Sequence, residues 1–184
     1  SIIKDTVLII SETPTARIRN IGLFLREQGW KVNFMFKKET NYSSPSYDYS
    51  KIGNIYYYVS SYQALLYYAN SDNFLVHFID QPTLTLSLFV KYYSKQTIYA
   101  PIDIFDGTMN ENNKNINKSI KKTIRLQNNI INKSKYIIFR DLQIKSSKEF
   151  KSYKIKDKKI LFFHDYVTST ELTKPLINNE KTIK

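Results

Sequence analysis

Short apolar runs alternate with longer amphipathic segments along most of the chain. Each run has the length of a strand, and each amphipathic segment repeats its apolar residues every three or four positions. The predicted strands are residues 7–11, 32–36, 55–59, 74–79, 97–99, 136–139 and 160–163. The predicted helices are residues 16–28, 62–70, 82–94, 116–133 and 142–153.

The best-defined unit lies at the N-terminus. The apolar run of residues 7–10 lacks polar alternation, as expected of a strand that is buried on both faces in a parallel sheet. Glu12, Thr13, Pro14 and Thr15 end it, a helical pattern follows, and Gly29 is the stop signal before the next strand. These elements predict a βαβ unit.

The continued alternation predicts an α/β fold. Parallel strands need crossover connections, so we expect a Rossmann-like open parallel sheet of six or seven strands with helices on both faces. A chain of 184 residues can bury such a core, and we expect residues 1–184 to form one domain. The polar residues 37–51 and 106–115 predict exposed loops.

Positive charge is concentrated in the C-terminal part of the chain. Residues 1–108 hold ten Lys/Arg and nine Asp/Glu, whereas residues 109–184 hold eighteen and seven. A basic face that attracts nucleic acid or anionic lipid is one interpretation, and lysine on solvated faces without a partner is the other. The predicted helix of residues 116–133 carries much of this charge.

Several classes of protein are disfavoured. The chain has no cysteine and two histidines, so we expect neither a disulfide framework nor a metal site. It lacks both a long apolar run and a secretory signal, which predicts a cytoplasmic protein. The glycine-rich loops of dinucleotide-binding proteins and ATPases are missing, as is the nucleophile elbow of hydrolases.

Ligands of open parallel sheets bind beyond the carboxyl ends of the strands, where the strand order reverses. The corresponding loops are residues 11–16, 80–83 and 100–107. Thr13 or Thr15 can cap the helix that follows the first strand, and Arg17 and Arg19 can meet a phosphate or carboxylate there. Solvated arginines in the first turns of a surface helix are the alternative.

Four segments of the sequence resemble the N-terminal domain of GT-B glycosyltransferases, in particular the large retaining family of group 1 (family 4) enzymes that use nucleotide sugars. The opening ETPTARIRNIGLFLREQGWKV, residues 12–32, matches its first loop and a helix that ends in glycine. NFLVH (73–77) is similar to the fourth strand and TIYAPID (97–103) to the fifth strand and its loop. Residues 125–138 resemble the helix and strand that follow.

This resemblance implies an acceptor-binding domain, with the nucleotide-sugar donor held by a C-terminal domain that this chain lacks. It implies no cofactor within residues 1–184 and no transfer by them alone. Asp103 would be the catalytic carboxylate, which orients or deprotonates an acceptor hydroxyl. The residues expected to bind the acceptor are Glu12, Thr13, Thr15, Arg17, Asp80, Gln81 and Asp106.

The expected partners are a glycan or lipid-linked acceptor of bacterial envelope synthesis and the donor-binding domain. An anionic membrane surface is a further candidate for the basic helix, with the protein peripheral to the inner membrane. Nucleic acid is a poor candidate because its usual binding motifs are missing.

Departures from the family pattern favour an alternative function. Pro101 and Ile102 stand where the family often has a donor-contacting histidine, and Gln127 and Lys135 replace its usual Glu and Asp. A catalytically inactive Rossmann-like binding module therefore remains an alternative. A response-regulator-like domain is weaker, because Glu12 is the single acid at the end of the first strand. His77 is interpreted as a core histidine.

Overall fold

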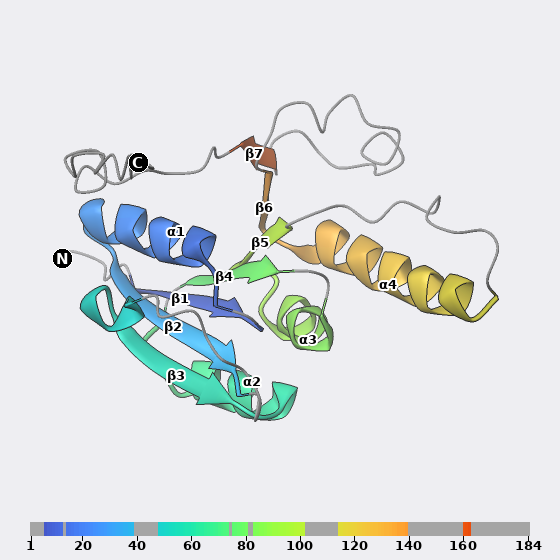
Figure 1. Cartoon of the computed structure of the whole chain (residues 1–184), viewed down its shortest axis with the longest axis horizontal. Coiled ribbons are helices and arrows are strands. Elements are labelled where there is room, and N and C mark those ends of the chain that lie inside the picture. The colour runs from blue at the N-terminus through green and yellow to red at the C-terminus, as the bar shows by residue number, and fades with distance from the viewer. Residues whose placement is uncertain are drawn as a thin grey trace, which may run out of the picture.

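A computed structural model describes residues 6–12, 14–38, 48–73, 75–80, 83–101, 114–139 and 160–162, with the backbone alone at 77–80, 114–117 and 160–162. The strands are β1 (Thr6–Ser11), β2 (Lys31–Lys37), β3 (Asn54–Tyr58), β4 (Leu75–Asp80), β5 (Thr97–Pro101), β6 (Tyr136–Phe139) and β7 (Ile160–Phe162). The helices are α1 (Ala16–Glu27), α2 (Ser61–Ala69), α3 (Leu84–Tyr92) and α4 (Lys114–Lys133), with a 3-10 turn η1 at Tyr49–Lys51. Figure 1 shows their arrangement.

The seven strands form one parallel sheet in the order β3-β2-β1-β4-β5-β6-β7. The predicted α/β class and open parallel sheet are therefore confirmed. From β1 the chain first builds toward β3, then crosses back to β4 and builds in the other direction. The strand order consequently reverses between β1 and β4, and this pair defines the switch point of the sheet.

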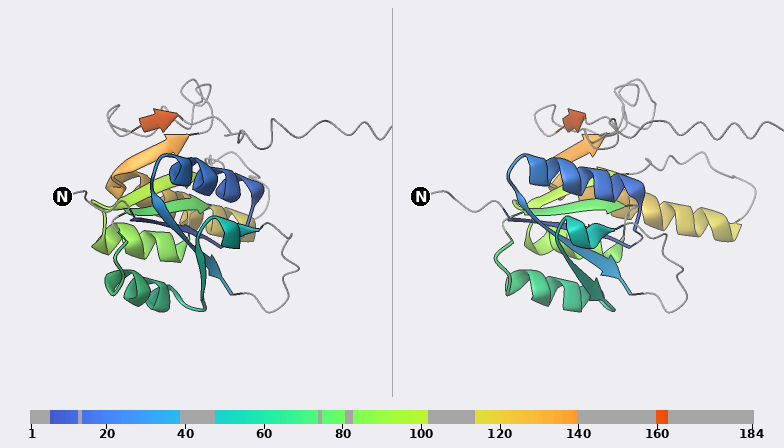
Figure 2. Two further views of the ribbon diagram at one scale, coloured as in Figure 1. Left: turned by 90° about the vertical axis from the view of Figure 1, so that its left-hand side faces the viewer. Right: turned by 60° about the vertical axis from the view of Figure 1, so that its left-hand side comes forward.

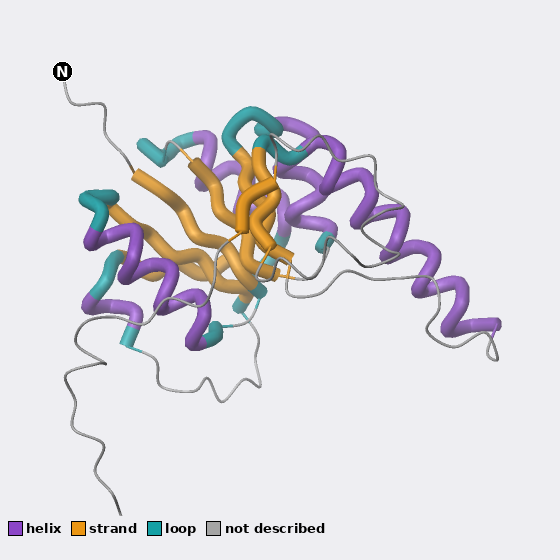
Figure 3. The backbone as a smooth tube through the Cα atoms, turned by 90° about the horizontal axis from the view of Figure 1, so that it is seen from above, coloured by secondary structure: helices purple, strands orange, loops and turns teal. Residues whose placement is uncertain are grey.

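Alternate side chains of the strands supply the two halves of the core. Leu8 and Ile10 point to the face that α2, α3 and α4 cover. Val7 and Ile9 point to the face that α1 covers together with η1. Figures 2 and 3 show the sheet between these helices. Every residue of β1 is buried, which explains why its sequence is apolar without alternation.

The bounds of the described elements agree with the prediction to within two residues, and two differences have a clear physical cause. Helix α3 begins at Leu84 rather than at residue 82, because the Thr83 side chain accepts a hydrogen bond from the Leu86 amide and so acts as the N-cap. The segment 37–51, predicted as an exposed loop, starts with a residue of β2 and ends in η1, where Tyr49 is buried. The predicted helix at 142–153 lies outside the described residues.

Gly53 is required by the close approach of two backbones. It precedes β3, and a Cβ atom at this position would lie 1.9 Å from the carbonyl oxygen of Val32 in β2. That separation is far below van der Waals contact, and the obstacle is backbone rather than a flexible side chain. The entry of β3 into the sheet therefore depends on a residue without a side chain.

We predict that Gly53→Ala lowers the free energy of unfolding by about 3 kcal/mol, because the start of β3 must move away from β2. Chemical denaturation measures this loss. Gly29→Ala is the comparison: Gly29 has a φ of 89°, but an added Cβ would meet no atom within 4 Å, so only backbone strain, roughly 1–2 kcal/mol, is expected there. Equal losses in the two variants would contradict the predicted clash.

Candidate functional site

The carboxyl edge of the sheet at the switch point is the candidate site. Ile10 pairs with Phe78 across β1 and β4, and continuing this register sets Glu12 level with Asp80. Asp80 in turn pairs with Pro101 at the end of β5. Since adjacent strands are about 4.8 Å apart, the backbones of these three residues form one short row along the edge.

Helix α1 begins directly beside this row. Thr15 has extended backbone angles, and its hydroxyl accepts a hydrogen bond from the Ile18 amide at 3.4 Å, which makes it the N-cap. Of the two residues predicted to cap this helix, Thr13 and Thr15, it is Thr15 that forms the cap. The amides of a first helical turn and the positive end of the helix dipole favour an anionic group at this position.

Arginines extend the positive character of this helix end. Arg17 lies in the first turn and is partly buried, and its Nη2 atom is inaccessible to solvent. Arg19 is also partly buried, and its Nη2 donates to Asn20 Oδ1 at 3.2 Å. Both side chains are therefore less solvated than the alternative interpretation implied.

A carboxylate balances this charge. Glu12 lies 3.8 Å from the Nζ atom of Lys37, at the ends of the neighbouring strands β1 and β2. Both side chains keep about a third or more of their surface exposed, so the pair is weak and can open for a ligand. Glu12 can accept hydrogen bonds from hydroxyl groups, and Arg17 can donate to anionic ones.

The turn η1 supports the loop from the α1 side. The Tyr49 hydroxyl donates to the Thr15 carbonyl oxygen at 2.6 Å, and the ring packs against Phe34 and Phe36 with centroids 5.0 Å away. Hydrogen bonds to Asp48 from Ser50 and then from Lys51 lower the pKa of this carboxyl group. The loop is thus anchored by a buried aromatic group and not by glycine.

Three of the predicted site residues, Glu12, Thr15 and Arg17, are described, and they lie between the end of β1 and the first turn of α1. Asp80 is the last residue of β4 and lies at the same edge of the sheet, where the structure describes its backbone alone. His77 lies within β4, paired with Ile9 and Ile98, and its side chain is likewise not described. Thr13, Gln81, Asp103 and Asp106 lie outside the described residues.

Lys37 and Tyr49 belong to the site but were missed from the sequence. The contact between Lys37 and Glu12 could have been predicted, because the two residues carry opposite charges and lie at the carboxyl ends of two adjacent parallel strands. Tyr49 gave no such signal: it contacts Thr15 across 34 positions from within a polar segment.

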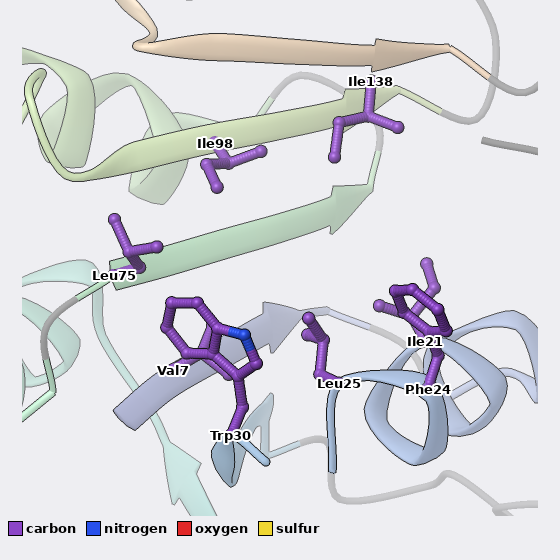
Figure 4. Close-up of a pocket in the computed structure, with 8 residues that line it drawn as sticks. All are labelled: Val7, Ile21, Phe24, Leu25, Trp30, Leu75, Ile98 and Ile138. Carbon is purple, nitrogen blue, oxygen red and sulfur yellow. The ribbon is translucent and has the colours of Figure 1, made fainter. Parts of the chain in front are cut away.

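A separate apolar cavity of about 140 Å³ lies beneath the end of α1 (Figure 4). Its lining residues are Val7, Ile21, Phe24, Leu25, Trp30, Leu75, Ile98 and Ile138. Val7, Leu75 and Ile98 lie near the starts of their strands, so the cavity opens toward the amino edge, away from the candidate site. It presents no side chain that could hydrogen-bond a sugar hydroxyl apart from the Trp30 indole.

Comparison with models of known protein families found no match, and comparison with curated proteins found none either. Within the described ranges, His, Asp and Glu side chains form no group of three or more that could hold a metal ion. In the same part of the chain, no helix combines the length and the apolar character needed to cross a bilayer. Function must therefore be argued from the geometry of the carboxyl edge.

We predict that Thr15→Ala lowers the free energy of unfolding by about 1 kcal/mol, because the first turn of α1 loses its cap. Thr15→Ser retains the hydroxyl and should keep most of the stability. Urea denaturation of the three proteins measures the difference. If alanine and serine at position 15 have the same effect, the hydroxyl is not an effective cap.

Proposed function

We propose that this chain is the acceptor-binding domain of a nucleotide-sugar-dependent glycosyltransferase, acting on a glycan or lipid-linked acceptor of the bacterial envelope. The observation that carries the proposal is the polar switch point: a glycine-free turn after β1 joins Glu12 to a capped helix with Arg17 in its first turn. The resemblance of the sequence to GT-B N-terminal domains leads to the same assignment.

The absence of glycine in this turn argues against a donor nucleotide as the ligand of this edge. A pyrophosphate must approach the backbone closely, and side chains on residues 11–16 prevent that approach. A sugar acceptor needs instead hydroxyl, carboxylate and guanidinium groups at the rim, and Glu12, Thr15 and Arg17 supply them. The donor would be bound by a second domain.

In this proposal Arg17 orients the acceptor through a phosphate or carboxylate group, and Glu12 accepts hydrogen bonds from its hydroxyls. Asp103 remains the proposed catalytic carboxylate, and Thr13, Asp80, Gln81 and Asp106 remain proposed acceptor-binding residues. The protein would work in the cytoplasm, at the inner membrane where lipid-linked acceptors are presented.

A binding module without catalysis is the second candidate. It is favoured by the departures from the family pattern, with Pro101 and Ile102 where the family often has a donor-contacting histidine, and with Gln127 and Lys135 in place of its usual Glu and Asp. In that case the same edge would bind an anionic ligand without reacting with it.

The proposal predicts that the chain binds a hexose 1-phosphate, a mimic of a lipid-linked acceptor, and shows no tight binding of uridine or guanosine diphosphate. Arg17→Ala should weaken sugar-phosphate binding about tenfold, the value of one charge-assisted hydrogen bond. Isothermal titration calorimetry measures both ligands. Lys31→Gln, at the opposite edge of the sheet, is the matched control for loss of one positive charge.

Tight nucleotide binding by the chain would contradict an acceptor role, and so would sugar-phosphate binding that is unchanged in Arg17→Ala. A sugar phosphate that binds at this edge but is never glycosylated, even when the donor domain is supplied, would favour the binding module.

A further inference from the structure

The outward sides of α2, α3 and α4 form a surface whose composition differs from the rest of the protein. These helices lie side by side on one face of the sheet, as Figure 1 shows, and their inner sides supply one half of the core. We call their outward sides the helical face. It lies on the opposite face of the sheet from α1 and η1.

Cations form a stripe along α4. The exposed residues Lys118, Lys121, Lys122 and Arg125 follow the spacing of one helix side, and the exposed Lys133 continues it. From Lys118 to Lys133 the stripe is about 22 Å long. The opposite side of the helix holds the buried Gln127, Ile130 and Ile131, so the orientation of the stripe is fixed by the core.

Large apolar side chains occupy the outward sides of the two neighbouring helices. Tyr62 and Leu66 are one turn apart on α2, and Leu84 and Tyr92 lie on the outer side of α3. Tyr62, Leu84 and Tyr92 each expose more than 60% of their surface. The exposed large apolar residues of the described chain all lie on α2, on α3 or at the end of β3, and none lies on α1.

The helical face also lacks negative charge. Helices α2, α3 and α4 contain no aspartate or glutamate at any of their positions. Lys91 adds a further cation on α3, with its Nζ atom 5.1 Å from the centroid of the Tyr92 ring. A surface that combines exposed apolar groups with cations, on helices that contain no acidic residue, matches the boundary between anionic headgroups and acyl chains.

We propose that the helical face is a docking surface for an anionic phospholipid bilayer. The cations of α4 contact the headgroups, while Tyr62, Leu66, Leu84 and Tyr92 enter the interface. Two observations favour a bilayer over nucleic acid. The stripe lies on a convex helix that extends beyond the sheet (Figure 1) rather than in a groove, and Leu66 and Leu84 cannot stack on bases. The inference deepens the proposed location at the inner membrane, and it can be tested separately from acceptor binding because none of the residues named for the helical face is named for the candidate site.

Co-sedimentation of the full chain with vesicles tests the proposal. We expect binding to vesicles of phosphatidylcholine mixed with phosphatidylglycerol, little binding to pure phosphatidylcholine, and weaker binding at high salt. The triple variant Lys118→Gln/Lys121→Gln/Lys122→Gln should bind the anionic vesicles roughly 100-fold more weakly, at about fivefold per lysine. The matched control Lys31→Gln/Lys38→Gln/Lys51→Gln removes three exposed cations away from the helical face and should bind almost as the unaltered chain does.

The apolar part of the surface needs its own variant. Leu66→Ser/Leu84→Ser changes two exposed side chains, so the fold should persist, as circular dichroism can verify. The two substitutions should weaken vesicle binding at both salt concentrations. The loss should be larger at high salt, because attraction to the headgroups is screened there and apolar contact supplies more of the binding. If this variant binds vesicles as well as the unaltered chain does at high salt, only charge contributes to binding, and the claim that apolar side chains enter the interface is wrong.

Equal weakening of vesicle binding in the two triple variants would overturn the proposal, since net charge alone would explain the attraction. So would tighter binding to a single-stranded oligonucleotide that the α4 variant abolishes, or self-association through Leu66 and Leu84 detected by light scattering. Sugar-phosphate binding by the α4 triple variant should not change. A failed vesicle experiment therefore leaves the acceptor proposal intact, and a failed acceptor experiment leaves this one intact.

Discussion

Burial of β1 on both faces is the constraint on which the rest of the structure depends. All six residues of this strand are buried, and it pairs in parallel with β2 on one side and β4 on the other. Parallel neighbours cannot be reached by tight turns, so the chain must cross the sheet with helices. The right-handedness of such crossovers then sends α1 to one face and α2, α3 and α4 to the other.

The same constraint separates the two surfaces that bear on function. Because the strand order reverses at β1 and β4, the edge near Glu12 is where a ligand of such a sheet is expected, and α1 begins beside it. The helices that complete the opposite face turn their apolar sides inward to Leu8 and Ile10. Their outer sides are consequently free to carry the lysines of α4 and the exposed apolar groups of α2 and α3 without affecting the ligand edge.

The sequence was sufficient to predict the described strands and helices, because buried strands and amphipathic helices have distinct periodicities. Their alternation was sufficient to predict that the strands are parallel. Helix α4 and β6 were placed correctly to within two residues at their ends. The start of α3 was placed two residues too early, since Thr83 competes with the preceding proline as the start signal. The burial of Tyr49 could not be foreseen, because it depends on Phe34, Phe36 and Thr15, which are distant in the sequence.

The candidate site was only partly accessible from the sequence. Glu12, Thr15 and Arg17 adjoin a strand end that the apolar pattern locates, so they could be named in advance. Lys37 reaches the site only once the register of β1 and β2 is known. The helical face was visible as basic charge alone, because which side of α2 or α3 faces outward depends on the packing of both helices against the sheet.

Chemical-shift mapping of backbone amides during a hexose 1-phosphate titration tests the central claim most directly. If the carboxyl edge at the switch point binds the acceptor, the largest shifts will fall in residues 11–17 and at the end of β4. Shifts centred instead on Trp30, Leu75 and Ile98, around the cavity at the amino edge, would contradict the assignment.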